Sequence, residues 1–167
     1  MKKFKSLFLT LAAFVPMAGI ATMVSCNKET GYFKIKGNEL VGLTEAGSKQ
    51  TDLVLPESVT IIGPNAFKNQ KLKSITGANV VEIKDNAFNS TLALEAATFN
   101  KVTKIGDQAF YGSRIQTVNF EALNDIKNIG NRAFMNTSYL KTFNSAIDQE
   151  TLKSQGTSIF QDSLFIK

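Results

Sequence analysis

The sequence predicts a repeat solenoid that is mainly β, because one short motif occurs four times at almost constant spacing. The motif begins with isoleucine and ends with the pair alanine-phenylalanine, and its copies occupy residues 62–67, 83–88, 105–110 and 129–134. Successive motif phenylalanines lie 21, 22 and 24 residues apart. A period of this length is typical of solenoids, in which each repeat buries its apolar face on its neighbours. Short apolar pairs separated by turn residues favour brief strands with tight or short helical returns over long helices.

The chain divides into five predicted segments. These are a signal peptide (1–25), a polar tether (26–31), an N-terminal capping hairpin (32–51), the repeat array (52–145) and a degenerate C-terminal repeat or cap (146–167). The hairpin is predicted from alternating residues around Gly37 and Asn38, a pair that suits a two-residue turn, and a polar loop follows at 44–51. In the last segment, Ser163 and Leu164 are expected at the alanine and phenylalanine positions of the motif. Terminal repeats are expected to be atypical because they cover the open ends of the stack.

The first 26 residues predict export and lipid attachment. Three lysines among the first five residues precede the apolar stretch 7–21, which is the pattern of a secretory signal helix and is short for a membrane span. The only cysteine, Cys26, follows the small residue Ser25, where cleavage is expected. This arrangement resembles the lipobox of bacterial lipoproteins, in which the cysteine receives acyl chains such as palmitate and becomes the mature N-terminus. The alternative is a plain N-terminal membrane anchor with an incidental cysteine.

The charge of the chain gives no support to nucleic-acid binding. The sequence has 19 basic and 14 acidic residues, and three of the basic residues lie in the predicted signal peptide, which leaves 16 against 14. The high isoelectric point therefore comes mostly from the targeting segment. We expect an exported protein, held on the outer face of the cell membrane by its N-terminal lipid.

Each position of the motif has an expected structural role. Glycine follows the isoleucine at 63, 106 and 130, where a Cβ would hinder the turn, although Lys84 takes this place in the second copy. The next residues are expected to act as N-caps or first helical residues: Pro64, Asp85, Asp107 and Asn131. The motif phenylalanines are expected to stack as an aromatic core: Phe67, Phe88, Phe110 and Phe134. An aromatic stripe could also bind a ligand, but the strict spacing favours core packing.

The second apolar pair of each repeat predicts a strand with a polar outer face. Since residues alternate across a strand, Ile75, Ala97, Val118 and Phe143 are expected to point inward and their neighbours outward. The outward residues form two columns, from which we select as candidate binding residues Ser74, Thr76, Thr98, Thr117, Asn119, Thr142 and Asn144. This hydroxyl- and amide-rich face could recognise an extended polypeptide or a glycan. The other interpretation is an ordinary exposed sheet whose Thr and Asn side chains form ladders of hydrogen bonds.

The residue types argue against catalysis. The sequence has no histidine, so Ser-His and Cys-His nucleophile pairs and histidine metal sites cannot be built. Asp85 and Asp107 could pair as carboxylates for glycoside hydrolysis, but their equivalent turn positions favour capping. We find no phosphate-binding glycine loop and no calcium motif. We therefore expect no enzyme activity, no cofactor and no metal.

The repeated Ile-Gly-x-x-Ala-Phe core is similar to BspA-like leucine-rich repeats of bacterial and protozoan surface proteins. The stretch 53–62, an apolar triplet followed by proline and the Ile-Gly turn, resembles the first strand of such repeats. The resemblance covers about residues 32–145 and implies a right-handed, leucine-rich-repeat-like solenoid with a role in surface adhesion or protein binding. A lipobox joined to such repeats is similar to the surface lipoproteins of mycoplasmas.

The leading hypothesis is a lipid-anchored adhesion or protein-binding protein whose partner is a host or bacterial surface protein. A structural component of the bacterial surface is the alternative, and a solute-binding lipoprotein of a transporter is the third possibility.

Overall fold

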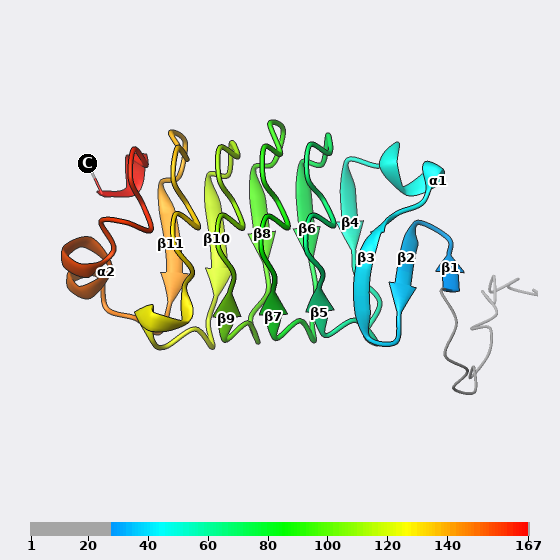
Figure 1. Ribbon diagram of the computed structural model, residues 1–167, viewed down its shortest axis with the longest axis horizontal. Helices are drawn as coiled ribbons and strands as arrows, with labels where there is room; N and C mark the ends of the chain where they lie inside the picture. The colour runs from blue at the N-terminus through cyan, green and yellow to red at the C-terminus, as the bar shows by residue number, and fades with distance from the viewer. Residues whose placement is uncertain (1–27, 167) are drawn as a thin grey trace, which may run out of the picture.

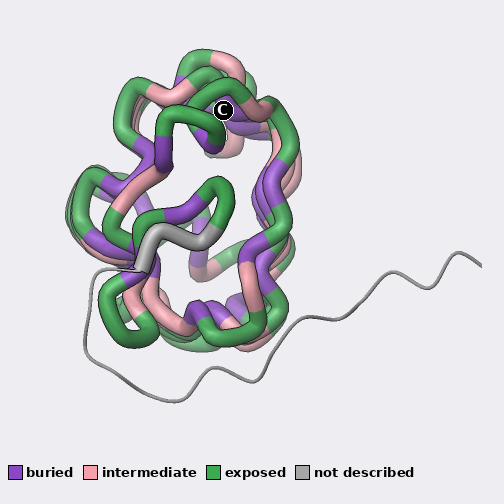
Figure 2. The backbone as a smooth tube through the Cα atoms, turned by 90° about the vertical axis from the view of Figure 1, so that its right-hand side faces the viewer, coloured by how far each residue is buried: buried purple, intermediate pink, exposed green. Residues whose placement is uncertain are grey.

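The structure is a computed structural model that describes residues 28–166 of the chain. The predicted signal helix and Cys26 lie outside the described residues. The described residues form a mainly β solenoid with two sheets that run along the stack, which confirms the predicted fold class (Figure 1). Viewed along the stack, the coils lie behind one another around a common interior (Figure 2). No helix among the described residues is long and apolar enough to cross a membrane.

The strands of successive coils form two sheets that run along the stack. The first sheet, here called sheet A, consists in spatial order of β1 (Lys28–Thr30), β2 (Phe33–Lys36), β3 (Glu39–Leu43), β5 (Ile61–Ile62), β7 (Glu82–Ile83) and β9 (Lys104–Ile105). The second, sheet B, consists of β4 (Asp52–Val54), β6 (Ser74–Thr76), β8 (Ala96–Thr98), β10 (Thr117–Phe120) and β11 (Thr142–Ser145). Sheet B is parallel throughout, and sheet A is parallel from β3 onward. The two apolar pairs of the first three repeats therefore supply two strands each. In the fourth repeat the second pair supplies β11, whereas Ile129 makes only an isolated parallel bridge to Ile105.

The N-terminal cap is the predicted hairpin, and it extends sheet A. Strands β2 and β3 pair in antiparallel fashion around a turn in which Gly37 has φ of +63°. Leu40 of β3 lies beside Ile62 in a parallel pair, so the hairpin covers the first coil. The tether prediction was wrong for residues 28–30, which form β1 because they find an antiparallel partner in β2.

The predicted loop 44–51 contains a short helix, α1 (Glu45–Ser48). The Thr44 hydroxyl accepts a hydrogen bond from the Gly47 backbone N–H at 3.1 Å, which satisfies one of the free donors at the helix start. A Cβ on Gly47 would overlap the backbone carbonyl of Tyr32, so the glycine allows the helix to pack on the cap. The helix formed where we expected a loop because both of these local contacts were available.

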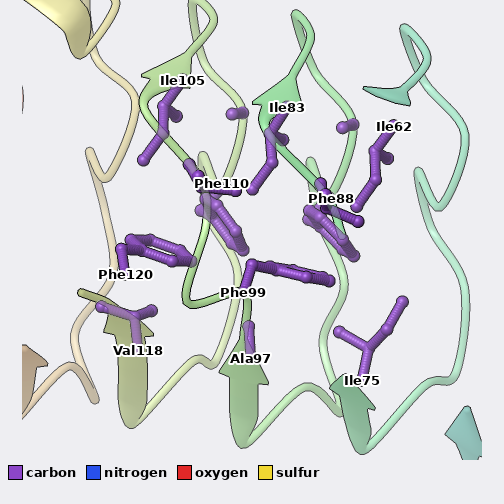
Figure 3. Close-up of a cluster of buried hydrophobic side chains, with 14 of the residues drawn as sticks. Ile62, Ile75, Ile83, Phe88, Ala97, Phe99, Ile105, Phe110, Val118 and Phe120 are labelled. Carbon is purple, nitrogen blue, oxygen red and sulfur yellow. The ribbon is translucent and has the colours of Figure 1, made fainter. Parts of the chain in front are cut away.

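The motif phenylalanines form the predicted aromatic stack in the interior. Phe67, Phe88, Phe110 and Phe134 are fully buried, and neighbouring rings are nearly parallel with centroids 4.8–4.9 Å apart. The inward residues of the two sheets point toward this layer of rings from two sides (Figure 3). Phe99 and Phe120 were not included in the prediction, and they form a second stacked pair with centroids 6.3 Å apart. The core is therefore more aromatic than the motif alone indicated.

The glycine of the motif is needed for close approach between coils. A Cβ on Gly130 would overlap the backbone of Asp107 and Gly106 in the preceding coil, and one on Gly106 would overlap Asp85. The left-handed backbone conformation falls two residues later in each copy, at Asn65, Asn86, Gln108 and Arg132, with φ between 54° and 59°. The constraint at the glycine is thus steric contact with the neighbouring coil.

The aspartates at the third position of the motif, Asp85 and Asp107, connect successive coils. The Asp85 carboxylate accepts a hydrogen bond from the Asp107 backbone N–H at 2.9 Å, and Asp107 accepts one from the Asn131 N–H at 2.8 Å. The expectation that they cap helices of their own coil was wrong, because the motif forms turns without a helix at these positions. Each carboxylate instead satisfies a donor one coil further along the stack.

The C-terminal end is closed by a final turn whose register differs from the prediction. Phe160, and not Leu164, takes the phenylalanine position: its ring stacks on Phe134 with centroids 5.4 Å apart. Ile159 therefore occupies the alanine position, and its carbonyl accepts a hydrogen bond from the Phe134 N–H. The reason is that Gly156 supplies the glycine, after the helix α2 (Gln149–Gln155) has replaced the preceding strand. Two short 3-10 helices complete the described secondary structure, η1 (Ile126–Asn128) and η2 (Leu164–Ile166).

Candidate functional site

The candidate site is the outer face of sheet B, and its residues lie in the predicted columns. The first column is Asp52, Ser74, Ala96, Thr117 and Thr142, and the second is Val54, Thr76, Thr98, Asn119 and Asn144. The inward column between them, Leu53, Ile75, Ala97, Val118 and Phe143, is buried. The alternation was predictable because the side-chain period of a strand is two, so a buried central residue places both neighbours outside.

The outer columns are accessible to different degrees. Thr76 and Asn144 are exposed, whereas Ser74, Thr98, Thr117, Asn119 and Thr142 are half-buried. Neighbouring rungs of a sheet are only about 4.8 Å apart, so each side chain covers part of the next. The face is thus closely packed, and a partner would contact mainly the outer ends of these side chains.

One end of the second column is joined by amide hydrogen bonds. The Asn119 side-chain amide donates to the Thr98 hydroxyl at 3.2 Å, and the Asn144 amide donates to the Asn119 carbonyl oxygen at 2.6 Å. This ladder is the arrangement expected of an exposed sheet that satisfies its own polar groups. It restricts the rotamers of Asn119, so the residue presents a fixed surface to any partner.

Three hydroxyl groups on the face remain available. Thr76, Thr117 and Thr142 make no side-chain hydrogen bond to the described part of the chain. A threonine hydroxyl both donates and accepts hydrogen bonds. These groups are spread over three of the five rungs, so a ligand could contact them along the direction of the stack.

A single charged group, Asp52, lies within the two columns. The Ser74 hydroxyl donates to its carboxylate at 2.6 Å, and this bond, with a second one from Thr51, holds the pKa of Asp52 below its ordinary value. Asp52 therefore stays ionised at neutral pH and marks the N-terminal end of the face. The remaining positions are uncharged, apart from the row that borders them.

The row that borders the face was missed by the sequence reasoning. Lys73, Glu95, Gln116 and Lys141 precede the four strands β6, β8, β10 and β11, and a hydrogen bond joins the backbone of each to the next along the row. Lys73, Glu95 and Lys141 are exposed. The signal was available in the sequence, since these residues sit at the same offset before each inward residue. They add charges of both signs along one side of the polar face.

Hollows also occur elsewhere on the described surface. One, of about 430 Å³, is lined by turn residues that include Asp107, Gln108 and Arg132, and another, of about 550 Å³, lies beside α1. Neither is lined by a residue of the outer face of sheet B. Within residues 28–166 no cluster of Cys, Asp or Glu side chains has the arrangement of a metal site. The predicted lipidation residue, Cys26, lies outside this range.

The comparisons with known proteins agree with the repeat geometry. The model of the BspA type leucine-rich repeat region matches residues 46–167 with six copies. The chain belongs to this family. The match extends the BspA-type array beyond the four Ile-to-Phe motifs, into the C-terminal segment whose final turn holds Phe160. No curated protein matches the sequence.

Three solved leucine-rich repeat structures are similar to this BspA-type chain. One from Bacteroides ovatus has 22% identity and a TM-score of 0.54, covering 77% of this chain and 42% of its own. One from Eubacterium ventriosum has 19% identity and a TM-score of 0.51, covering 71% and 40%. A leucine rich cell surface protein from Faecalibacterium prausnitzii has 19% identity and a TM-score of 0.47, covering 81% and 45%. The first two support the fold alone, and this chain spans less than half of the length of each solved chain.

Proposed function

We propose that this BspA-type repeat protein is a lipid-anchored surface protein that binds a polypeptide or a glycan through the outer face of sheet B, without catalysis. The observation that carries the proposal is the register of sheet B, which aligns hydroxyl and amide groups without interruption from Thr76 to Asn144 in the second column and on both sides of Ala96 in the first. The free hydroxyls of Thr76, Thr117 and Thr142 supply donors and acceptors that the fold itself does not use.

The size of the face fits weak binding by each copy. Five rungs at the spacing of a sheet extend about 20 Å along the stack. A face of this length offers few hydrogen bonds to one ligand, and each contributes little net free energy. Many copies attached to one membrane would raise the overall affinity, because the second binding event becomes local. Lipid attachment and a small polar face therefore support the same function.

The face can be tested by adding bulk and charge at two free hydroxyls. The double variant Thr76→Lys/Thr117→Lys should bind immobilised extracellular-matrix proteins and glycans at least ten-fold more weakly than the unaltered mature chain. The matched control is Thr103→Lys, which places the same change on an exposed position beside sheet A. Equal loss in both variants, or no loss in the double variant, would reject sheet B as the binding face.

The lipid anchor has its own test. The unaltered full-length chain should partition into the detergent phase and incorporate an alkyne-labelled palmitate, because Cys26 provides the attachment site. Cys26→Ser should remove both properties while the repeat domain stays folded by circular dichroism. Incorporation that persists in Cys26→Ser would contradict the assignment of the lipid to this residue.

A further inference from the structure

The described part of the chain begins inside the folded domain. Lys28 is already paired with Ile35, and Thr30 with Phe33, in the antiparallel ladder of β1 and β2. β1 is also the outermost strand of sheet A. Figure 1 places β1 at one end of the long axis of the molecule and α2 at the other. The first described strand is therefore held in the cap at the N-terminal end of the stack.

A single residue, Asn27, separates Cys26 from β1. Two residue spacings reach at most about 7 Å even in a fully extended chain. We propose that β1 holds the solenoid by its N-terminal end directly on the lipid bilayer, with the C-terminal turn as its membrane-distal end. This inference rests on the lipid anchor proposed above, and it differs from the polar tether over residues 26–31 that the sequence predicts.

Paired charges occupy the part of sheet A that runs from the hairpin cap to β9. Two of its lysines are paired with glutamates from neighbouring rungs, Lys84 with Glu39 at 3.1 Å and Lys104 with Glu82 at 2.9 Å. Anionic headgroups attract surfaces with unopposed basic residues. These two pairs offer little attraction to anionic headgroups, whereas the exposed Lys36 lies on β2, next to the anchored edge. The charges of sheet A therefore do not oppose an orientation in which β1 is the end closest to the membrane.

The attachment also sets the distance of each strand of sheet B from the membrane. β4 is nearest to the anchored end and β11 is farthest, four strand spacings or about 19 Å away. A large partner approaching from outside the cell would reach Thr142 and Asn144 before it reached Ser74. The binding face would then be presented from its C-terminal rungs.

The orientation can be measured by energy transfer from two labelled sites to the membrane. Lys36 lies on β2 next to the anchored edge, and Lys127 lies in η1, two residues before Ile129, which bridges to β9. Both side chains are exposed. Because Cys26 is the only cysteine and its thiol is blocked by lipid, Lys36→Cys and Lys127→Cys can each carry one donor dye. The lipidated full-length chains are placed in phosphatidylcholine vesicles that contain acceptor-labelled headgroups.

The label at residue 127 should lie farther from the acceptor plane than the label at residue 36, by up to five strand spacings or about 24 Å. A ten-residue Gly/Ser insertion between Asn27 and Lys28 should reduce this difference to near zero. Equal distances in the native chain, or an insertion without effect, would overturn the orientation. Chains that fail to sediment with the vesicles would instead overturn the lipid anchor, and the orientation with it.

Discussion

The two sides of sheet B repeat with the same period but obey different constraints. The inward side holds apolar residues such as Ile75 and Val118 against the stacked phenylalanines, and all of them are buried. The outward side varies from Ala96 to Asn119 while the backbone register stays the same. The comparison teaches that recurrence of apolar, buried character, even where side-chain size varies from Ala97 to Phe143, reports packing between coils. Positions that vary at constant register are the ones free to recognise a partner.

The largest expected effect tests the inward side. Phe110 is fully buried and stacks on both Phe88 and Phe134. Phe110→Ala should lower the free energy of unfolding by about 3–5 kcal/mol, because it removes buried area and leaves a cavity. Thr117→Ala, on the outward side, should change it by less than about 1 kcal/mol. Urea denaturation of the mature chain measures both, and similar losses would abolish the distinction between the two sides.

Two glycines of the turns differ in the same way, since one lies closely against the preceding coil and the other does not. A Cβ on Gly130 would overlap backbone atoms of the preceding coil, so Gly130→Ala should cost about 1–3 kcal/mol. Gly112 has φ of +63°, and a Cβ there would meet only the Ser90 hydroxyl, in ordinary contact at 4.0 Å; Asn136 holds a similar φ of 60° one coil further along. Gly112→Asn should therefore cost less than about 1 kcal/mol, since asparagine tolerates this conformation. A larger loss for Gly112→Asn in thermal melts would show that the coil contact has been overestimated.

A smaller effect is expected at two buried hydroxyls of the interior. The Thr137 hydroxyl donates to the Phe134 carbonyl at 2.6 Å, whereas the Ser113 hydroxyl is buried without a hydrogen-bond partner. Thr137→Ala should cost about 1–2 kcal/mol, and Ser113→Ala should be neutral or slightly stabilising, because it removes an unsatisfied polar group. Chemical denaturation of the two variants gives the comparison. Equal destabilisation would indicate that Ser113 has a partner in solution.

The repeat, the inward columns and the hairpin cap could be predicted from the sequence, because each depends on a periodic pattern of apolar residues or on a single turn. It failed where a contact between distant residues decided the outcome. Asp85 bonds to the next coil, 22 residues along, and a local capping rule could not foresee that partner. Phe160 takes the last place in the stack because α2 replaces a strand, which shifts the register relative to the motif.

The candidate face was predicted correctly as a set of columns, but its degree of exposure was not. Exposure depends on how far neighbouring rungs cover one another, and half-burial of Thr98 and Asn119 follows from the ladder that joins them. The bordering row with Lys73 and Lys141 was also missed, because strict alternation would place residues two positions before the inward residue on the inward side, whereas these residues precede the strands and are exposed. Sequence patterns therefore located the face, and the structure decided which of its groups are free.

The smallest expected effect concerns the charged end of the outward side. The hydrogen bond from Ser74 is the main reason that the pKa of Asp52 is lowered. A lowered folded-state pKa contributes stability above the unfolded-state pKa, and this contribution is lost as pH falls through the folded-state value. Ser74→Ala should therefore raise the Asp52 pKa and weaken the pH dependence of stability on the acidic side of about pH 4.

Carbon-detected NMR titration of the carboxyl groups compares the unaltered chain with the Ser74→Ala variant. Asp148 is a matched control, because its lowered pKa arises from Thr151 and should not respond to Ser74→Ala. An unchanged Asp52 pKa in the variant would contradict the assigned cause.

Photo-crosslinking on intact cells tests the central claim most directly, because it asks which side of the solenoid meets a partner. A benzophenone amino acid at position 117 on sheet B should yield one defined crosslinked species, and mass spectrometry of that species would show whether the partner is a host molecule or a component of the same cell surface. The same amino acid at position 103, beside sheet A, should yield none. Crosslinks of equal yield at both positions, or only at position 103, would contradict the assignment of binding to the outer face of sheet B.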